Sequence, residues 1–441
     1  MTVKKNENII FSSTRQWNPG DEFILMGVRA ILKRLNVKYN SMLFNRNPDI
    51  RSCFEDRQIF KYSRLDEHFI HNPDLIDLEA NIKFDFFDNS VKPNRDYSYV
   101  DWVIFAGTPE WSSGRMCDLY SAIIRYQLPV IILGVGGNAD LYCENFREVI
   151  QKSKLFTVRS ESTLKAVEKQ GFSASLMPCP ALLCAPTVWE KTIIKVKRIG
   201  LIFHATRDDS VIWNGFSAQA YAFMMSLFQQ VITDYGETHE ISLVCHYIDE
   251  VAVARAAFPD FNVAYSHDAA DYFEIYSAYD LVIGPRVHGV GVAASMGIPG
   301  IAISHDQRGS TTAGFLADIL DINDDPEASR ITVRQAIEAA PAKSAQLREH
   351  KAQTMERYVE RVREAMTDRT VSYQSRWDFI PSKTYMLDDL RPLMGALEMV
   401  KYGHPADVPG REERLSALVP EMRERLINIE HKINQMMRER E

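Results

Sequence analysis

Short apolar runs separated by helix-like segments constrain the fold of this chain more than any other feature. The run at 130–133, Val-Ile-Ile-Leu, is apolar at every position, which is typical of a strand covered on both faces. The segments 21–35 and 116–126 carry apolar residues at helical spacing. Because consecutive parallel strands are joined by helical crossovers, this alternation predicts an α/β protein built on doubly wound parallel sheets.

Two series of such units divide the chain. Expected strands of the first series lie at 8–13, 82–87, 102–106, 130–135, 155–158 and 174–177, and those of the second at 199–204, 241–245, 263–265, 281–283 and 300–304. Between the series, residues 178–195 contain three prolines among apolar residues, which favours an extended connector. Because 441 residues exceed one hydrophobic core, we expect Rossmann-like domains over 1–185 and 196–325, facing each other across a cleft.

Two further segments do not follow this rhythm. Residues 45–80 lack periodicity and are expected to form an insertion in the first domain, either a lid or a surface excursion. Residues 326–441 are charged and helical in pattern, and they form an expected C-terminal extension. Near its end an apolar stripe fits either a homo-oligomer contact or packing on the same subunit. The stripe consists of Leu415, Leu418, Met422, Leu426, Ile429 and Ile433.

Composition and spacing exclude several classes of function. A net charge of -8 argues against a nucleic-acid partner held by a broad basic surface. No window approaches the length and apolarity of a signal peptide or a transmembrane helix, so we expect a cytoplasmic protein. The six cysteines have no Cys-x-x-Cys spacing, and neither a zinc-protease nor a Walker motif stands in a suitable context. We therefore expect no metal and no cofactor.

Residues 280–309 form the most informative stretch for function. An apolar strand must end at Pro285, which lacks an N–H group and restricts the residue before it. Arg286 and His288 follow at the start of a helix rich in small residues. The backbone N–H groups of a helix N-terminus favour bound anions, and a guanidinium matches a carboxylate or phosphate with two parallel hydrogen bonds. The stretch therefore predicts an anion site with a titratable imidazole beside it.

Two motifs carry a resemblance to a known family. The first is Arg286-Val287-His288-Gly289 followed by Gly297-Ile298-Pro299, and the second is Asn18-Pro19-Gly20-Asp21 before a helix. In both, the chain resembles the polysaccharide pyruvyl transferase family over roughly residues 8 to 320. The resemblance implies a GT-B-like pair of domains. It also implies transfer of the enolpyruvyl group of phosphoenolpyruvate to two hydroxyls of a glycan or glycolipid, which gives a pyruvate ketal and phosphate.

The implied reaction needs cationic pockets for a carboxylate and a phosphate, and an acid near neutral pH. His288 suits the acid–base role and Arg286 the role of anion ligand. Arg159, at the end of an expected strand, could supply the second cation. The competing structural interpretations are that Arg286 pairs with a nearby acid such as Asp280, that His288 satisfies a buried carbonyl, and that Arg159 pairs with Glu161 or with a carboxylate at the domain boundary.

Several other residues are candidates for binding substrate because they follow expected strands or lie in loops. The 134–139 loop has Gly-x-Gly-x-x-Ala spacing, and we expect it to contact a small anion or a sugar rather than a dinucleotide. Asp21 could cap its helix without any function. The remaining candidates are Asn18, Gly20, Gly136, Gly137, Asn138, Arg207, Gly289, Ser304 and His305, with Trp111 as a possible stacking surface for a sugar ring.

Two other classes of function stay open at this point. The twin-domain architecture also serves nucleotide-sugar glycosyltransferases, because a fold does not determine a function. A regulatory relative could instead use the helical C-terminus to bind partners, although the presence of both Arg286 and His288 argues against it.

Overall fold

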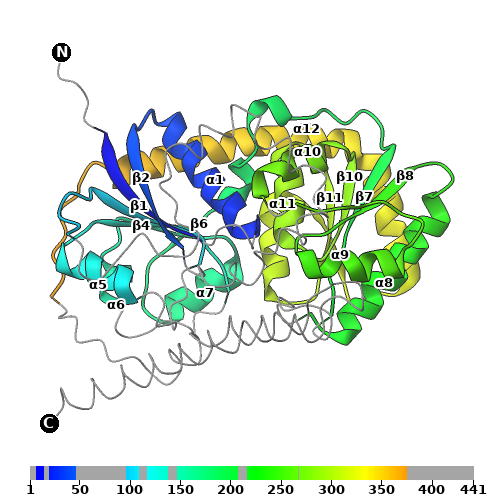
Figure 1. Cartoon of the computed structure of the whole chain (residues 1–441), viewed down its shortest axis with the longest axis horizontal. Helices are drawn as coiled ribbons and strands as arrows, with labels where there is room; N and C mark the ends of the chain where they lie inside the picture. Colours follow the sequence, from blue (N-terminus) through cyan, green and yellow to red (C-terminus); the bar gives the residue numbers. More distant parts are fainter. Residues whose placement is uncertain are drawn as a thin grey trace, which may run out of the picture.

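The computed structural model describes residues 6–13, 19–45, 96–108, 117–137, 147–206, 216–266 and 268–374. Within these ranges the protein consists of two six-stranded sheets flanked by helices, and every strand pairing is parallel. Figure 1 shows the two sheets side by side, with helices α1 and α11 between them. The predicted pair of doubly wound domains is confirmed.

The first sheet has the strand order β2-β1-β3-β4-β5-β6. Its strand order reverses between β1 and β3, and ligands of open α/β sheets bind at the carboxyl ends near such a point. The strands are β1 Glu7–Ser13, β2 Tyr39–Asn45, β3 Trp102–Ala106, β4 Val130–Val135, β5 Leu155–Val158 and β6 Ser175–Leu176. The helices are α1 Pro19–Arg34, α5 Cys117–Arg125, α6 Arg147–Gln151 and α7 Glu161–Lys169.

The second sheet has the order β9-β8-β7-β10-β11-β12, which is the Rossmann arrangement. Its order reverses between β7 and β10, so the residues after these two strands meet at one edge. The strands are β7 Arg198–Ile202, β8 Glu240–Val244, β9 Val263–Ala264, β10 Leu281–Gly284, β11 Gly300–Ser304 and β12 Asp318–Asp321. The helices are α8 Ala218–Tyr235, α9 Ile248–Ala257, α10 Tyr272–Ser277 and α11 Val287–Ser295, with the 3-10 segments η7 Ala269–Asp271 and η8 Gln307–Phe315.

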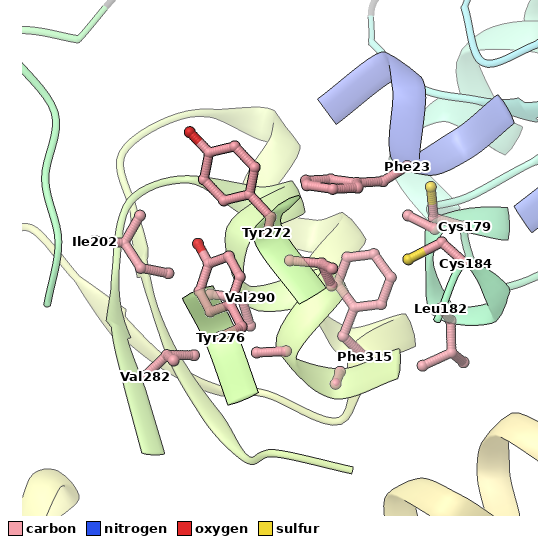
Figure 2. Packing of buried hydrophobic residues seen from close by; sticks show 14 of the residues in the cluster. Phe23, Cys179, Leu182, Cys184, Ile202, Tyr272, Tyr276, Val282, Val290 and Phe315 are labelled. Atoms are coloured by element: carbon pink, nitrogen blue, oxygen red, sulfur yellow. The ribbon is translucent and has the colours of Figure 1, made fainter. Parts of the chain in front are cut away.

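One hydrophobic core continues from the first domain into the second. Ile9 and Phe11 of β1 lie in it, whereas Ile10 between them belongs to a separate core on the other face of the first sheet. Phe23 of α1 meets Tyr272 of α10 edge to face with ring centroids 5.9 Å apart, and Figure 2 shows the two rings side by side. Apolar packing therefore joins the two domains at α1.

The connector between the domains differs from the extended segment that its prolines predict. It forms two short 3-10 helices, η5 Pro180–Leu183 and η6 Thr187–Trp189, and η5 is fully buried. A Cβ at Gly27 of α1 would overlap the carbonyl oxygen of Pro180, so only glycine lets α1 approach η5 this closely. Cys179, Leu182 and Cys184 face the shared core in Figure 2.

Helix α12, Pro326–Ala365, runs past both domains along the top of Figure 1. Arg330 near its start bonds Asp234 of α8, and Tyr358 near its end donates to the carbonyl of Pro178 at 2.7 Å. The chain then crosses to the first domain, where Tyr373 is buried in the core beneath the first sheet. Residues 46–80 of the predicted insertion, the predicted strand at 82–87 and the apolar stripe near the C-terminus lie outside the described residues.

Candidate functional site

The carboxyl ends of the two sheets meet at His288 and Arg159. His288 lies in the first turn of α11, directly after β10, and Arg159 directly follows β5 of the other domain. Nη1 of Arg159 is 3.1 Å from Nε2 of His288. Two of the residues proposed from sequence, one from each domain, are thus in hydrogen-bonding contact, as the convergence of strand ends predicts.

Arg159 is a buried cation. Its side chain is 9% exposed, and the described residues give it no carboxylate partner, so the predicted alternative of a bridge to Glu161 is wrong. Its Nε has no hydrogen-bond partner within the described part of the chain. A buried charge without a counter-ion is costly, which makes Arg159 a natural receptor for an anion.

Gly136 makes room for this guanidinium. A Cβ at position 136 would overlap Nε of Arg159 and approach its Cζ to 2.7 Å. The neighbouring Gly137 has φ +103°, a conformation that favours glycine, and the space beside its Cα is open. Two glycines of the predicted loop therefore have distinct roles: Gly136 accommodates Arg159, and Gly137 turns the backbone.

Helix N-termini add partial positive charge at the same place. Helix α7 begins at Glu161, and its N-cap Ser160 directly follows Arg159. Oγ of Ser160 accepts from the N–H of Thr163 at 3.3 Å. Helix α11 begins right after Arg286. Both helices have nine residues, and their dipoles favour an anion at the site.

Helix α1 begins at Pro19, in the first-turn position that suits proline. Asp21 therefore lies inside the first turn, and the prediction that it caps the helix is wrong. Gly20 is buried in the same turn. Oγ of Ser13, at the end of β1, donates to the carbonyl of Asp21 at 3.2 Å, which ties the helix start to the strand before it.

Arg286 points to a different set of partners from His288. Its guanidinium forms an ion pair with Oε1 of Glu250 and lies over the ring of Tyr247, with Cζ 4.3 Å from the centroid. Glu250 is 0% exposed, and its Oε2 accepts from the backbone N–H groups of His246 and Tyr247 at 3.0 and 3.1 Å. Arg286 is thus neutralised by an internal carboxylate that the sequence did not suggest.

The predicted alternative that Arg286 pairs with an acid is confirmed, but the acid is Glu250 and not Asp280. Asp280 instead accepts from Nζ of Lys191 at 3.1 Å and from the backbone N–H groups of Lys197 and Arg198. Burial tends to raise the pKa of Asp280, but these donors together lower it below its ordinary value. Asp280 therefore anchors the connector to the second sheet and is remote from the chemistry of Arg286.

Two further histidines lie along the same edge of the second sheet. His204 follows β7 and His305 follows β11, on either side of β10. The ring of His204 stacks on Phe216 with centroids 4.2 Å apart, and His305 meets Phe216 edge-on at 4.8 Å. Nδ1 of His204 is 3.8 Å from Oε1 of Glu250. These rings form a wall of the site beside the Arg286–Glu250 pair.

His246, after β8, is a buried neutral group. Its Nε2 is 2.8 Å from the hydroxyl of Tyr276. Burial holds the pKa of His246 well below its ordinary value, and the charge of Arg286 lowers it further. The imidazole is therefore uncharged at neutral pH and has a structural role beneath the site.

Cys179 completes the contact between the domains. Its Sγ lies 3.9 Å from Nε2 of His288 and 3.9 Å from Nη1 of Arg159. Burial raises the pKa of this thiol, and the charge of Arg159 offsets only part of the rise. The thiol is thus neutral, and no sequence signal distinguished Cys179 from the other scattered cysteines.

The remaining predicted site residues are distributed as follows. Gly289 packs against Tyr276 and Ile202, and a Cβ there would lie 2.7 Å from the Tyr276 hydroxyl. The small size of Gly289 therefore serves packing within the second domain. Ser304 ends β11, and its Oγ fills the space beside Gly309. Four candidates lie outside the described residues: Asn18, Asn138, Arg207 and Trp111.

The described residues contain no group of three or more His, Cys, Asp or Glu side chains placed to hold a metal ion. None of the described helices has the length and apolarity that a membrane crossing requires.

Comparisons with known proteins agree with the motifs. A family model described as polysaccharide pyruvyl transferase matches residues 18–307, which is more than half of the chain. The search of curated protein sequences found no match to this chain.

Among solved structures, the chain is similar to a UDP-GlcNAc 2-epimerase from Neisseria meningitidis, with 11% identity, TM-score 0.47, and coverage of 82% of this chain and 100% of that one. A UDP-GlcNAc 2-epimerase from Methanocaldococcus jannaschii has 10% identity, TM-score 0.42, and coverage of 76% and 93%. The trehalose-6-phosphate synthase OtsA has 8% identity, TM-score 0.45, and coverage of 83% and 100%.

Proposed function

The chain belongs to the polysaccharide pyruvyl transferase family, a family of transferases, and on that basis we propose that its donor is phosphoenolpyruvate and its product a cyclic pyruvate ketal on a glycan or glycolipid. Within this proposal the donor binds where the carboxyl ends of β5 and β10 meet. One observation carries it: Arg159, buried and without a carboxylate partner in the described chain, lies 3.1 Å from the imidazole of His288.

The donor fits this arrangement chemically. Phosphoenolpyruvate carries its carboxylate and its phosphate on the same carbon atom, so it needs dense positive charge in a small volume. Arg159 provides a full charge there, and the N-termini of α7 and α11 add partial charges of the same sign. His288 lies beside the anion receptor, where a general acid must be to reach the methylene carbon of the donor.

The reaction balances with these groups. His288 donates a proton to the methylene carbon, which becomes a methyl group, and positive charge develops on the neighbouring carbon. One acceptor hydroxyl adds there and loses its proton, the carbon–oxygen bond to phosphate breaks, and the second hydroxyl closes the ketal as it loses its own proton. One of the two released protons restores His288 and the other leaves with phosphate.

Arg286 has a more restricted role in this proposal than the motif alone implies. Its pairing with Glu250 leaves that pair without net charge, so Arg159 supplies the net positive charge of the site. We assign Arg286 to the phosphate side, where it stabilises the leaving group by hydrogen bonding while Glu250 and Tyr247 fix its guanidinium.

A direct assay tests the function. The full-length protein is incubated with phosphoenolpyruvate and a panel of free and lipid-linked glycans, and products are detected by mass spectrometry together with phosphate release. Pyruvate on an acceptor with one phosphate released per ketal supports the proposal, and His288→Gln serves as the inactive control. Calorimetric binding of a nucleotide sugar, with no response to phosphoenolpyruvate, would instead favour a glycosyltransferase.

A further inference from the structure

The contact between Arg159 and His288 fixes where the imidazole proton is. A guanidinium can only donate hydrogen bonds, so Nε2 of His288, at 3.1 Å from Nη1 of Arg159, must be the acceptor. The ring is then neutral and carries its proton on Nδ1. In this state His288 has no proton on the nitrogen that faces the anion receptor.

Arg159 is the full positive charge in contact with the ring. Arg159 approaches His288 from the first domain. Arg286, two residues before His288, is balanced by Glu250. The Cys179 thiol, at 3.9 Å, provides no negative charge, because burial raises its pKa. The net charge that these groups present to His288 is positive, which opposes an imidazolium.

Two further titratable groups face this region from other elements. Asp21 of α1 makes only the smallest contribution to the pKa of Cys179, where burial is the main cause and Arg159 the next. His246 lies beneath Gly289, with its Cε1 3.2 Å from the position of a Cβ there, and burial keeps it neutral. Arg159 is thus the group that hydrogen-bonds Nε2 of His288, and His246 adds no charge beside it.

We propose that Arg159 keeps His288 unprotonated until an anionic group of the donor engages the guanidinium. The donor anion then replaces Nε2 as the acceptor of the hydrogen bond from Arg159. It also supplies the negative charge that an imidazolium needs. Nε2 takes up a proton from solvent and becomes the acid that the transfer requires. This inference rests on the proposed function, and it makes protonation of the acid conditional on an occupied donor site.

Calorimetry in buffers of different ionisation enthalpy tests the step directly. Phosphoenolpyruvate is titrated into the full-length protein at pH 7.5, without acceptor, where its phosphate is almost fully ionised because the second pKa of a phosphate ester is about 6. We expect net uptake of protons in the wild type and no uptake in His288→Gln, with binding retained in both. Binding without proton uptake by the wild type would overturn the proposal.

A second measurement does not need the donor. In protein with isotope-labelled histidine rings, the His288 signal is identified by its loss in His288→Gln and followed against pH. We expect His288 to stay neutral to a lower pH in the wild type than in Arg159→Met. Gly136→Ala, which displaces the guanidinium without removing its charge, should shift the titration in the same direction, and it serves if Arg159→Met does not fold.

The two measurements separate the inference from the function. Identical titration of His288 in wild type and both variants would overturn the coupling, whatever the donor is. A clear difference in titration together with no binding of phosphoenolpyruvate would support the coupling and overturn the proposed donor.

Discussion

Nη1 of Arg159 and Nε2 of His288 lie 3.1 Å apart although 129 positions separate them in sequence. Each residue follows a strand of a different sheet, so the contact exists only when both domains are folded and joined. The continuous core through α1 and η5 explains how this spacing is maintained. The site is therefore a property of the assembled chain and not of either domain alone.

Replacing His288 by Gln should abolish pyruvyl transfer while leaving the donor bound. Gln keeps a polar side chain of similar reach but cannot act as an acid, and the loss of general acid catalysis costs roughly a hundredfold to ten-thousandfold in kcat. Phosphate release measured at saturating donor checks the rate, and calorimetry checks the affinity. A variant with wild-type kcat would remove His288 from its assigned role.

Replacing Arg159 should weaken donor binding and change the fold little. Arg159→Met keeps the length and apolar stem of the side chain but removes the charge, and we expect KM for phosphoenolpyruvate to rise by about a hundredfold, since a charge-assisted hydrogen bond contributes roughly 1.5–3 kcal/mol. Arg159→Lys should recover part of the loss, because it restores the charge without the planar fork. An unchanged KM in Arg159→Met would place the donor elsewhere.

A methyl group at Gly136 should act through Arg159. Its Cβ would overlap Nε of Arg159, so the guanidinium must move from its present position beside His288. We expect kcat/KM to fall roughly tenfold to a hundredfold, in line with the sensitivity of catalysis to small misplacements. Circular dichroism and the midpoint of thermal unfolding should change little, because Gly136 has no positive φ. In Arg159→Met the same substitution should have almost no additional effect.

The central strands and two of the four edge strands, β6 and β9, could be predicted from sequence, whereas the other two edge strands could not. Strands β3 and β4 are buried at every position, and such apolar runs stand out in the sequence. The prediction missed β2 and β12, which lie at the ends of their sheets. In β12 the sequence Asp-Ile-Leu-Asp buries only Leu320, so its strand character comes from pairing with β11. An edge strand of this kind has no pattern of its own to detect.

For the site, the sequence located residues but not their partners. Arg159 and His288 could be found because each follows an apolar strand and precedes a helix. Their contact depends on the relative placement of two domains, which no local pattern encodes. Glu250 lies within α9 and has the spacing of an ordinary helical acid, so nothing in the sequence marks it as the buried counter-ion of Arg286.

Removing the charge of Glu250 should destabilise the protein substantially. Glu250→Gln keeps an oxygen for the backbone N–H groups of His246 and Tyr247 but leaves Arg286 charged and buried, which costs roughly 3–5 kcal/mol. Urea unfolding measures the loss. Combined with Arg286→Met, the loss should be clearly smaller than the sum of the two single losses, because the variant pair contains no uncompensated charge.

A surface ion pair of α12 gives the matched control for that cycle. Arg361 and Glu364 are 47% and 60% exposed, and Glu364→Gln should change the free energy of unfolding by at most about 1 kcal/mol. If Glu250→Gln were no more costly than Glu364→Gln, the Arg286–Glu250 pair would not be the buried, charged contact that the structure shows.

The buried neutral His246 should make the protein sensitive to acid. Burial holds the folded-state pKa of His246 well below 6.5, so between these two values the unfolded chain binds a proton that the folded protein does not. Stability is then greatest above pH 6.5 and falls as pH decreases, by about 1.4 kcal/mol for each unit below 6.5.

Urea unfolding at pH 7.5, 6.5 and 5.5 measures this decline in wild type and in His246→Gln, whose amide can still hydrogen-bond the Tyr276 hydroxyl. Because other groups titrate equally in both proteins, the difference between the two curves isolates His246. We expect the variant to lose about 1.4 kcal/mol less than the wild type between pH 7.5 and 5.5, and parallel curves would show that folding does not lower the pKa of His246.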